Sequence, residues 1–535
     1  MLHTLLAIAV SGALAATFIG LDVLRRARSS ASRSFAQAAL TAWGAANILF
    51  VIFLWFNHAT FPLHLEVMEG TILQHAERAA RLAEVYPSPS PEYVPLAYNV
   101  LYYYLAAPFI AAFGPSLTVL RLLSIAGMLI SGVLIFGIVK RHTGSAWWGF
   151  IAVALFAAAY RTMDAYLDTA HSDAWFLCSA LAGSFLLDVS RSRAGNLAGV
   201  LLLVASFWFK QHGALFALGG LAFLTLREGR QSWPYWLAAA IAGPAVYLLA
   251  GPRLFGSHFH YFTWTVPSAW SELHLSSLDR YARFIIKYYG VLVVAATILM
   301  VNALRRGIRN LGIWEVQLVF AVLSGLMGAL DPGSSDNVFI AAGTWFIVVG
   351  SFAWRRFADG SARSRLQFIQ TGALFVSFGL LAYDPRTVIV SNQADAAYAD
   401  FLGMLNAIPG TVYAPSQGQL AAGYRFYPAA HWVALEDMVR GPNRDRRSQP
   451  MTRRLLEPVA APNHAAFILT DRPLYDENAV LEFLADRYVL VSDFGERFKP
   501  LKSTPKRWDP VWPRYLYRYD PNFAQRRSKS HRSAR

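Results

Sequence analysis

The sequence of 535 residues has few charged side chains: 15% are Asp, Glu, Lys or Arg, against roughly 25% in soluble proteins. Cys178 is its one cysteine, which excludes an intrachain disulfide and a metal site built from several cysteines. Acidic residues are fewer than basic ones, with 33 Asp+Glu against 48 Lys+Arg. Apolar residues reach 55%. This composition argues against a soluble nucleic-acid-binding protein, a disulfide-rich secreted domain or a disordered chain, and it predicts a polytopic membrane protein.

Twelve apolar runs approach the length of a membrane-spanning helix, about 20 residues. They are 2–20, 36–57, 118–139, 146–160, 172–188, 196–209, 213–226, 234–251, 286–304, 314–330, 338–354 and 366–383. Six alternate short connections between them hold 17 lysines and arginines, and such connections face the cytoplasm. Both chain ends and the long loops 58–117 and 252–285 are then outside. We expect a multi-pass protein of the bacterial inner membrane with its chemistry on the periplasmic face.

The pattern divides the chain into four parts. Residues 1–35 form an extra N-terminal transmembrane helix and a cytoplasmic linker, and 36–383 form the main transmembrane domain. Residues 384–523 have the composition of an extracytoplasmic α/β domain, and we expect the basic tail 524–535 to be disordered. Within the α/β domain, short apolar runs predict strands at 387–391, 411–414, 432–435, 466–469 and 488–492, with helices at 394–405 and 477–486.

Two carboxylates, Glu66 and Glu69, follow the second predicted span. At positions i and i+3 they share one face if this turn is helical. A carboxylate partly shielded from water at the membrane boundary could take the proton from a sugar hydroxyl. Alternatively, the pair only favours a helix N-terminus through its dipole. Which of the two glutamates would be the base is open at this point.

Polar residues also mark the outer ends of later spans, where charges are costly and usually have a partner or a function. Asp173 follows the outer turn that begins at Arg161, and could instead be a helix N-cap. Lys210, with Gln211 and His212, separates two apolar runs. A lysine recessed there suits a lipid phosphate, although it could simply snorkel to the interface.

Two further segments complete the outer face. Asp336 and Asn337 lie in the compact polar turn 331–337, whose glycine and serines could simply make a turn. Tyr98 and Tyr102 belong to an aromatic segment that suits the membrane surface, either as an interfacial helix or as part of an ordinary aromatic belt.

Taken in order, these motifs resemble those of GT-C-fold glycosyltransferases, the polytopic class that includes protein O-mannosyltransferases and lipid A aminoarabinose transferases. The resemblance covers about residues 36–383. The matching text is Glu66-x-x-Glu69-Gly70, Pro95-x-x-Tyr98-x-x-x-Tyr102-Tyr103, Gly114, Arg121, Ser172-Asp173-Ala174, Lys210-Gln211 and Gly333-x-x-Asp336-Asn337. Two positions depart from the pattern: Glu66 stands where relatives often have Asp, and Val338 where they usually have Tyr.

The resemblance implies a polytopic all-α fold with about 12 transmembrane helices and an inverting transfer of a sugar from a polyprenyl-phosphate donor. The acceptor would be a hydroxyl of a glycan, lipid or protein outside the membrane, and a divalent metal ion is used in some branches. The implied roles are catalysis for Glu66 and Glu69, donor-phosphate binding for Lys210, Arg161 and His212, and substrate binding for Asp173, Gln211, Tyr98, Tyr102, Asp336 and Asn337. A lipid-linked-sugar flippase or transporter and a non-catalytic membrane scaffold are the alternatives.

Overall fold

The computed structural model describes residues 30–270, 274–331, 333–357, 363–417, 420, 426–427, 429–440, 448–460, 465–474, 481–503 and 512–523. The first predicted span, 2–20, and the basic tail lie outside the described residues. The helices up to residue 381 are α2 (Ser30–Ala59), α3 (Glu69–Ala80), α4 (Leu101–Phe113), α5 (Leu117–Thr143), α6 (Ala146–Ala158), α7 (Asp173–Val189), α8 (Arg193–Phe209), α9 (Gly213–Glu228), α10 (Trp233–Ala240), the π-helical η2 (Ile241–Ala250), α11 (Gly251–Phe255), α12 (Val266–Trp270), α13 (Leu275–Arg305), α14 (Ile313–Ala329), α15 (Ile340–Phe357) and α16 (Arg363–Leu381).

Each of the eleven predicted spans within the described residues coincides with a helix or, for 234–251, with the continuous pair α10 and η2. Five helical stretches among the described residues are long and apolar enough to cross a membrane: Phe35–Ala59, Leu117–Thr143, Gly213–Phe255, Leu275–Arg305 and Asp336–Phe357. Helices α4, α6, α8 and α14 are apolar but shorter. The count of twelve spans stays a prediction.

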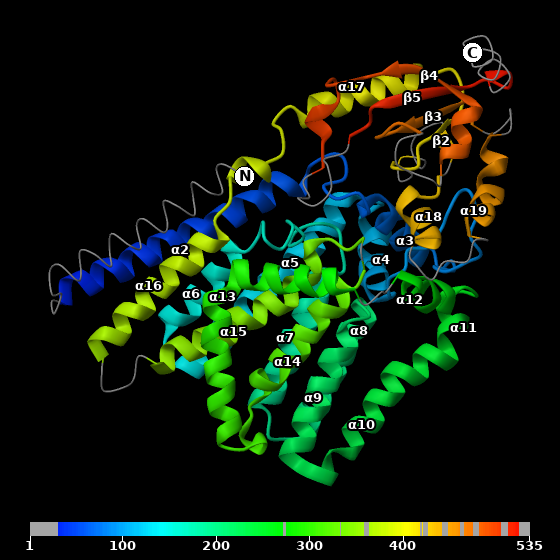
Figure 1. Ribbon diagram of the computed structural model, residues 1–535. Coiled ribbons are helices and arrows are strands. Elements are labelled where there is room, and N and C mark those ends of the chain that lie inside the picture. Colours follow the sequence, from blue (N-terminus) through cyan, green and yellow to red (C-terminus); the bar gives the residue numbers. More distant parts are fainter. Residues whose placement is uncertain are drawn as a thin grey trace.

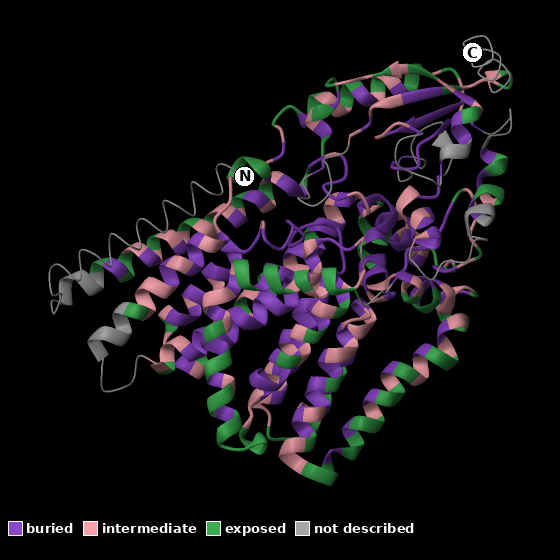
Figure 2. Ribbon diagram, in the orientation of Figure 1, coloured by how far each residue is buried: buried purple, intermediate pink, exposed green. Residues whose placement is uncertain are grey.

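Large apolar side chains point outward from the bundle. Phe56, Val133 and Leu249 are 78%, 70% and 76% exposed, on α2, α5 and η2. Buried residues concentrate where α5, α7, α14 and α15 pass through the centre, and exposed ones follow α2 and α10 (Figure 2). Since soluble monomers rarely expose such apolar surface, these faces suit lipid, and the chain is a multi-pass membrane protein.

Helices α7 and α8 pack closely and run in opposite directions, joined by a short connection. Glycines permit the approach: a Cβ on Gly183 would lie 2.7 Å from Leu203 Cγ and 2.8 Å from the carbonyl oxygen of Gly199. Small residues let helix backbones come together in this way inside membranes. The packing brings the first residue of α7, Asp173, to the same end as Lys210, which directly follows α8.

In the part of the C-terminal domain that the structure describes, five strands form a mixed sheet with helices on both faces. Its elements are α17 (Ala394–Ala407), β1 (Val412–Tyr413), β2 (Phe426–Tyr427), α18 (Trp432–Val439), α19 (Ser448–Leu456), β3 (Phe467–Thr470), β4 (Tyr488–Asp493) and β5 (Tyr515–Tyr519). The strand order is β2-β1-β3-β5-β4. Strands β1, β2 and β3 are parallel, and β5 runs antiparallel to both of its neighbours. The domain sits at one end of the helical bundle, above α3, α4 and α12 (Figure 1).

Two predicted strands in this domain are wrong. Residues 432–435 begin α18, where His431 Nδ1 accepts a hydrogen bond from the Val433 N–H and caps the helix. Residues 387–391 form no strand, because the chain turns through a 3₁₀ segment at Pro385–Thr387. The strands predicted at 411–414, 466–469 and 488–492 are confirmed as β1, β3 and β4, and α17 is confirmed. Strands β2 and β5 were not predicted, and the helix predicted at 477–486 is described only from residue 481, with a 3₁₀ turn at Glu482–Asp486.

The loop that precedes α3 packs into the core of the C-terminal domain. Leu63 and Leu65 are fully buried and share one hydrophobic cluster with Phe401 of α17 and with Val412 and Leu469 of β1 and β3. The segment that carries Glu66 is therefore sandwiched between the helical bundle and the C-terminal sheet.

Candidate active site

A buried ion pair fixes the start of α3. Both oxygens of Glu69 accept hydrogen bonds from Arg121 of α5, Oε1 from Nε at 3.0 Å and Oε2 from Nη2 at 2.6 Å. The backbone N–H groups of Ala170 and Leu65 also donate to this carboxylate, at 2.7 and 2.6 Å. Burial alone would raise the pKa of Glu69, but Arg121 and these donors outweigh it and hold the pKa below its ordinary value. Glu69 is thus a fully bonded anion that anchors the loop.

Glu66 has a different environment. Its side chain is 1% exposed, and Oε2 accepts a hydrogen bond of 2.9 Å from the Met68 N–H. Burial raises the pKa of Glu66 from 4.5 to about 8, and the negative charges of Glu69 and Asp164 act in the same direction. A carboxylate whose pKa lies near neutrality is suited to general-base catalysis. The sequence did not distinguish the two glutamates, whereas the structure makes Glu66 the candidate base and Glu69 a paired anion.

The outer turn between α6 and α7 packs beside Glu66. Asp164 and Ala165 have φ angles of 59° and 61°, in the left-handed region, where a non-glycine residue costs roughly 1–3 kcal/mol. Asp164 is fully buried and accepts a short hydrogen bond from the Ser335 hydroxyl. Backbone strain of this kind is concentrated at functional sites.

A second buried cluster surrounds Asp173. Its Oδ1 lies 2.7 Å from Lys210 Nζ, and its Oδ2 accepts a hydrogen bond of 3.1 Å from Asn337 Nδ2. His171 Nδ1 also makes a close contact with Oδ2. The N-cap position of α7 is occupied by Ser172, so Asp173 does not have the capping role that the sequence left open. The structure thus brings together Asp173, Lys210 and Asn337, which the sequence predicted separately.

Two tyrosines lie between Glu66 and this cluster. Tyr98 and Tyr166 each contact the ring of His171 edge-on, with centroids 5.3 and 5.4 Å away. The negative charges of Glu66 and Asp173 both add to the effect of burial in raising the pKa of each tyrosine. Glu66, the tyrosines and the Asp173 cluster therefore form one continuous polar site.

The remaining predicted residues lie at the margin of the site or inside the helical packing. Arg161 Nη1 is 3.9 Å from Asp164, and Arg280 donates to Asp336 at 3.2 Å. The Gln211 amide donates to backbone oxygens of Ala97 and Thr263, and His212 precedes α9. Tyr102 is fully buried, with its hydroxyl bonded to Leu120 O and to Ser124 at 3.0 and 2.9 Å. The role of Tyr102 in substrate binding stays a prediction.

Sequence reasoning missed two contributors. Tyr166 lies in the outer turn and had no motif to distinguish it. His171 precedes α7 without a motif of its own, and the structure places it between Asp173 and the two tyrosines. Among the described residues, no group of three or more His, Cys, Asp or Glu side chains is arranged to hold a metal ion. We assign no metal ligands, and metal dependence stays a prediction.

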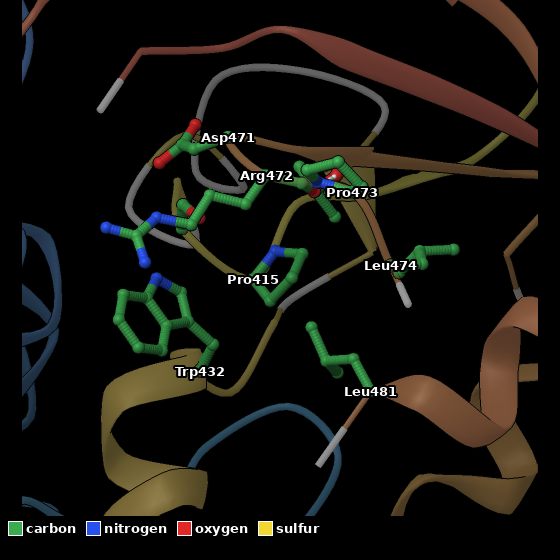
Figure 3. A pocket seen from close by; sticks show the side chains of 9 residues that line it. Pro415, Trp432, Asp471, Arg472, Pro473, Leu474 and Leu481 are labelled. Atoms are coloured by element: carbon green, nitrogen blue, oxygen red, sulfur yellow. Dashed lines mark hydrogen bonds between the residues drawn. The ribbon is translucent and has the colours of Figure 1, made fainter. Parts of the chain in front are cut away.

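A small cavity lies elsewhere, at the carboxyl ends of β1 and β3 in the C-terminal domain (Figure 3). It is lined by Pro415, Ser416, Trp432, Thr470, Asp471, Arg472, Pro473, Leu474 and Leu481. None of the predicted site residues lines this cavity, so it is not part of the candidate active site.

Comparison with known proteins gives a likeness of fold. No protein-family model and no curated protein matches the chain. The fold is similar to that of ArnT from Cupriavidus metallidurans in the apo state, with a TM-score of 0.51, 11% identity, and coverage of 91% of this chain and 99% of that chain. The structure of the same ArnT bound to undecaprenyl phosphate gives a TM-score of 0.47 and 11% identity, covering 89% of this chain and 98% of that one. The GT-C fold expected from the sequence motifs is confirmed.

Proposed function

We propose that this protein is an inverting glycosyltransferase. It would move a sugar from a polyprenyl-phosphate donor to a hydroxyl of a glycan, lipid or protein on the periplasmic face of the bacterial inner membrane. The fold it shares with apo ArnT and the ordered outer-face motifs support this class. The observation that carries the proposal is Glu66, a carboxylate that is 1% exposed and has a pKa raised to about 8, close to a buried lysine–carboxylate pair.

Glu66 is the proposed base. In the reaction, the acceptor oxygen bonds to the anomeric carbon as the bond from that carbon to the phosphate oxygen breaks. The hydroxyl proton passes to Glu66, and the electron pair of the broken bond leaves with the polyprenyl phosphate. A base with a pKa near the working pH combines a useful ionised fraction with good proton affinity. One carboxylate and one in-line displacement invert the anomeric centre.

Lys210 is the proposed partner of the donor phosphate. An ammonium group has three donor protons, and one of them is directed to Asp173 at 2.7 Å. The other two are available to a phosphate oxygen that gains charge as the sugar leaves, which is the point where a fixed cation lowers the barrier. Asp173, held by Asn337 and His171, keeps the lysine in place. Arg161 and His212 are the further candidates for the phosphate.

The membrane arrangement belongs to the same proposal. Twelve spans, with both chain ends outside, place residues 58–117 and the C-terminal domain on the periplasmic face. A polyprenyl-phosphate donor would then lie in the outer half of the bilayer, with its sugar at the level of Glu66 and Lys210.

The test is a transfer assay on the purified full-length protein in liposomes. The liposomes contain undecaprenyl phosphate carrying one of several radiolabelled sugars, and envelope lipids and glycans serve as acceptors. We expect label to move to an acceptor with release of undecaprenyl phosphate, and Glu66→Gln should slow that transfer by about 10²- to 10⁴-fold. Movement of the donor between leaflets without transfer would indicate a flippase instead, and neither activity would indicate a scaffold.

A further inference from the structure

The turn between α14 and α15, residues 331–337, contacts both the surroundings of Glu66 and the Asp173 cluster. The Ser335 hydroxyl donates to Asp164, beside Glu66, and the Asn337 amide donates to Asp173, the partner of Lys210. A shift of this turn would therefore move both the surroundings of the base and the phosphate-binding lysine.

The C-terminal domain reaches this turn through Arg440, the residue that directly follows α18. Its Nη2 lies 3.3 Å from an Asp331 carboxylate oxygen in the turn and 3.1 Å from one of Asp437 on α18. The guanidinium also stacks over the ring of Trp270, 4.3 Å from the centroid, at the end of α12. The Trp270 indole N–H in turn donates to the Asp437 backbone oxygen at 2.9 Å. Helix α18 lies between the C-terminal sheet and α12 (Figure 1). Arg440 thus joins three segments that are far apart in sequence.

Gly333 makes room for this contact. A Cβ at that position would overlap the Arg440 guanidinium. A side chain at this position would require the end of Arg440 to shift, so the glycine leaves room for the arginine against the turn in the arrangement observed.

The charges around Arg440 favour a positioning role over anion binding. One guanidinium faces two carboxylates, Asp331 and Asp437, which are 20% and 7% exposed. The local charge is already negative, so a donor phosphate would be repelled there. Lys210 faces the single carboxylate of Asp173, so negative charge does not exceed positive charge at that pair.

We propose that Arg440 is a positioning residue through which the C-terminal domain completes the active site. It holds the 331–337 turn so that Ser335 and Asn337 keep Asp164 and the Asp173–Lys210 pair in their working geometry. The transmembrane domain alone would then be a poor transferase. This inference rests on the proposed function for its kinetic consequence, whereas its structural consequence can be measured without any activity.

The first readout is backbone hydrogen exchange across 330–340 in the full-length protein. The Gly333 and Ser334 amides donate to Asp331 at 2.9 and 3.0 Å, and both bonds depend on the position of Asp331. In Arg440→Ala we expect exchange of these amides to accelerate by about tenfold or more, since local opening becomes easier. Arg440→Lys keeps the charge but not the stacking, so its exchange rates should lie between those of the wild type and of Arg440→Ala. Arg497→Ala is the matched control, because it breaks an exposed ion pair with Asp400 in the same domain, and it should leave this exchange unchanged.

The second readout is kinetic. Arg440→Ala should lower kcat/KM for the lipid-linked sugar by about 10- to 100-fold, the usual cost of a small misplacement of reacting groups. Asp331→Asn serves as a milder second variant if Arg440→Ala fails to fold. The double variant should lose no more kcat/KM than the more affected single variant, because the two substitutions break one shared contact.

The outcomes separate this inference from the proposed function. Faster exchange together with lower kcat/KM supports the positioning role, and unchanged exchange, or faster exchange with wild-type kinetics, overturns it. If the wild-type protein transfers none of the sugars tested, the proposed function fails on its own. The kinetic readout is then replaced by affinity for undecaprenyl phosphate, which should fall in Arg440→Ala and stay unchanged in Arg497→Ala. Equal affinity in the two variants would again overturn the inference.

Discussion

Replacing Glu66 by glutamine should stabilise the protein, and the gain should increase with pH. The side chain is 1% exposed and its pKa rises from 4.5 to about 8, chiefly through burial. Each tenfold change in proton affinity corresponds to about 1.4 kcal/mol. Folding therefore disfavours the ionised form of Glu66 by about 5 kcal/mol, and the neutral amide of glutamine avoids this cost.

The direction of the pH dependence follows from the raised pKa. The folded protein binds the Glu66 proton more tightly than the unfolded chain does, so this contribution to stability is complete below about pH 4.5 and is lost as the pH rises through 8. Glutamine does not titrate. The free energy of unfolding of Glu66→Gln should exceed that of the wild type by about 1 kcal/mol at pH 5, about 3 kcal/mol at pH 7 and about 5 kcal/mol at pH 9.

Thermal unfolding in detergent between pH 5 and pH 9 measures this difference. The apparent Tm of Glu66→Gln should rise above that of the wild type as the pH increases. Glu84→Gln, at an exposed position of the same outer loop, is the matched control and should follow the wild-type curve. Parallel curves for Glu66→Gln and the wild type would show that Glu66 is not a buried carboxyl with a raised pKa, and the assignment of the base would lose its physical basis.

Three further outcomes distinguish the site residues. Glu69→Gln should have the opposite effect on stability, lowering it by about 3–5 kcal/mol because it leaves the Arg121 guanidinium buried without its counter-charge; a wild-type Tm would contradict this. The kcat/KM of the wild-type enzyme should rise with pH and level off above about 8, as Glu66 loses its proton, and a flat profile from pH 6 to 9 would argue against Glu66 as the base. Lys210→Ala should weaken binding of undecaprenyl phosphate, with partial recovery in Lys210→Arg; unchanged affinity would mean that the lysine serves only Asp173.

The helical architecture was largely predictable because long apolar runs have few alternatives in a membrane protein. Eleven predicted spans coincide with helices for this reason. The C-terminal domain was harder, because a short apolar run such as 432–435 fits a strand or a buried helix equally well. The His431 cap decided that case. Strand β5 reads Tyr-Leu-Tyr-Arg-Tyr, an aromatic run that favours a strand, so its sequence did carry a signal that the prediction missed. Strand β2 has only two residues, and no local pattern reveals it.

The candidate site, like the fold, was predictable from the sequence only in part. Charged residues at the ends of apolar runs were visible in the sequence, and Asp173, Lys210 and Asn337 do meet. The distinction between Glu66 and Glu69 was not visible, because it depends on Arg121, which contacts only Glu69 of the two. The Arg440 contact was also hidden, since it joins residues more than a hundred positions apart.

The central claim is that Glu66 takes the acceptor proton during transfer from a polyprenyl-phosphate sugar. A single-turnover experiment tests it most directly: wild type and Glu66→Gln are loaded with the same labelled undecaprenyl-phosphate sugar, donor affinity is measured on each preparation, and acceptor is then added. The account predicts equal donor affinity and a rate of sugar transfer about 10²- to 10⁴-fold lower in Glu66→Gln. A transfer rate in Glu66→Gln close to that of the wild type would contradict it.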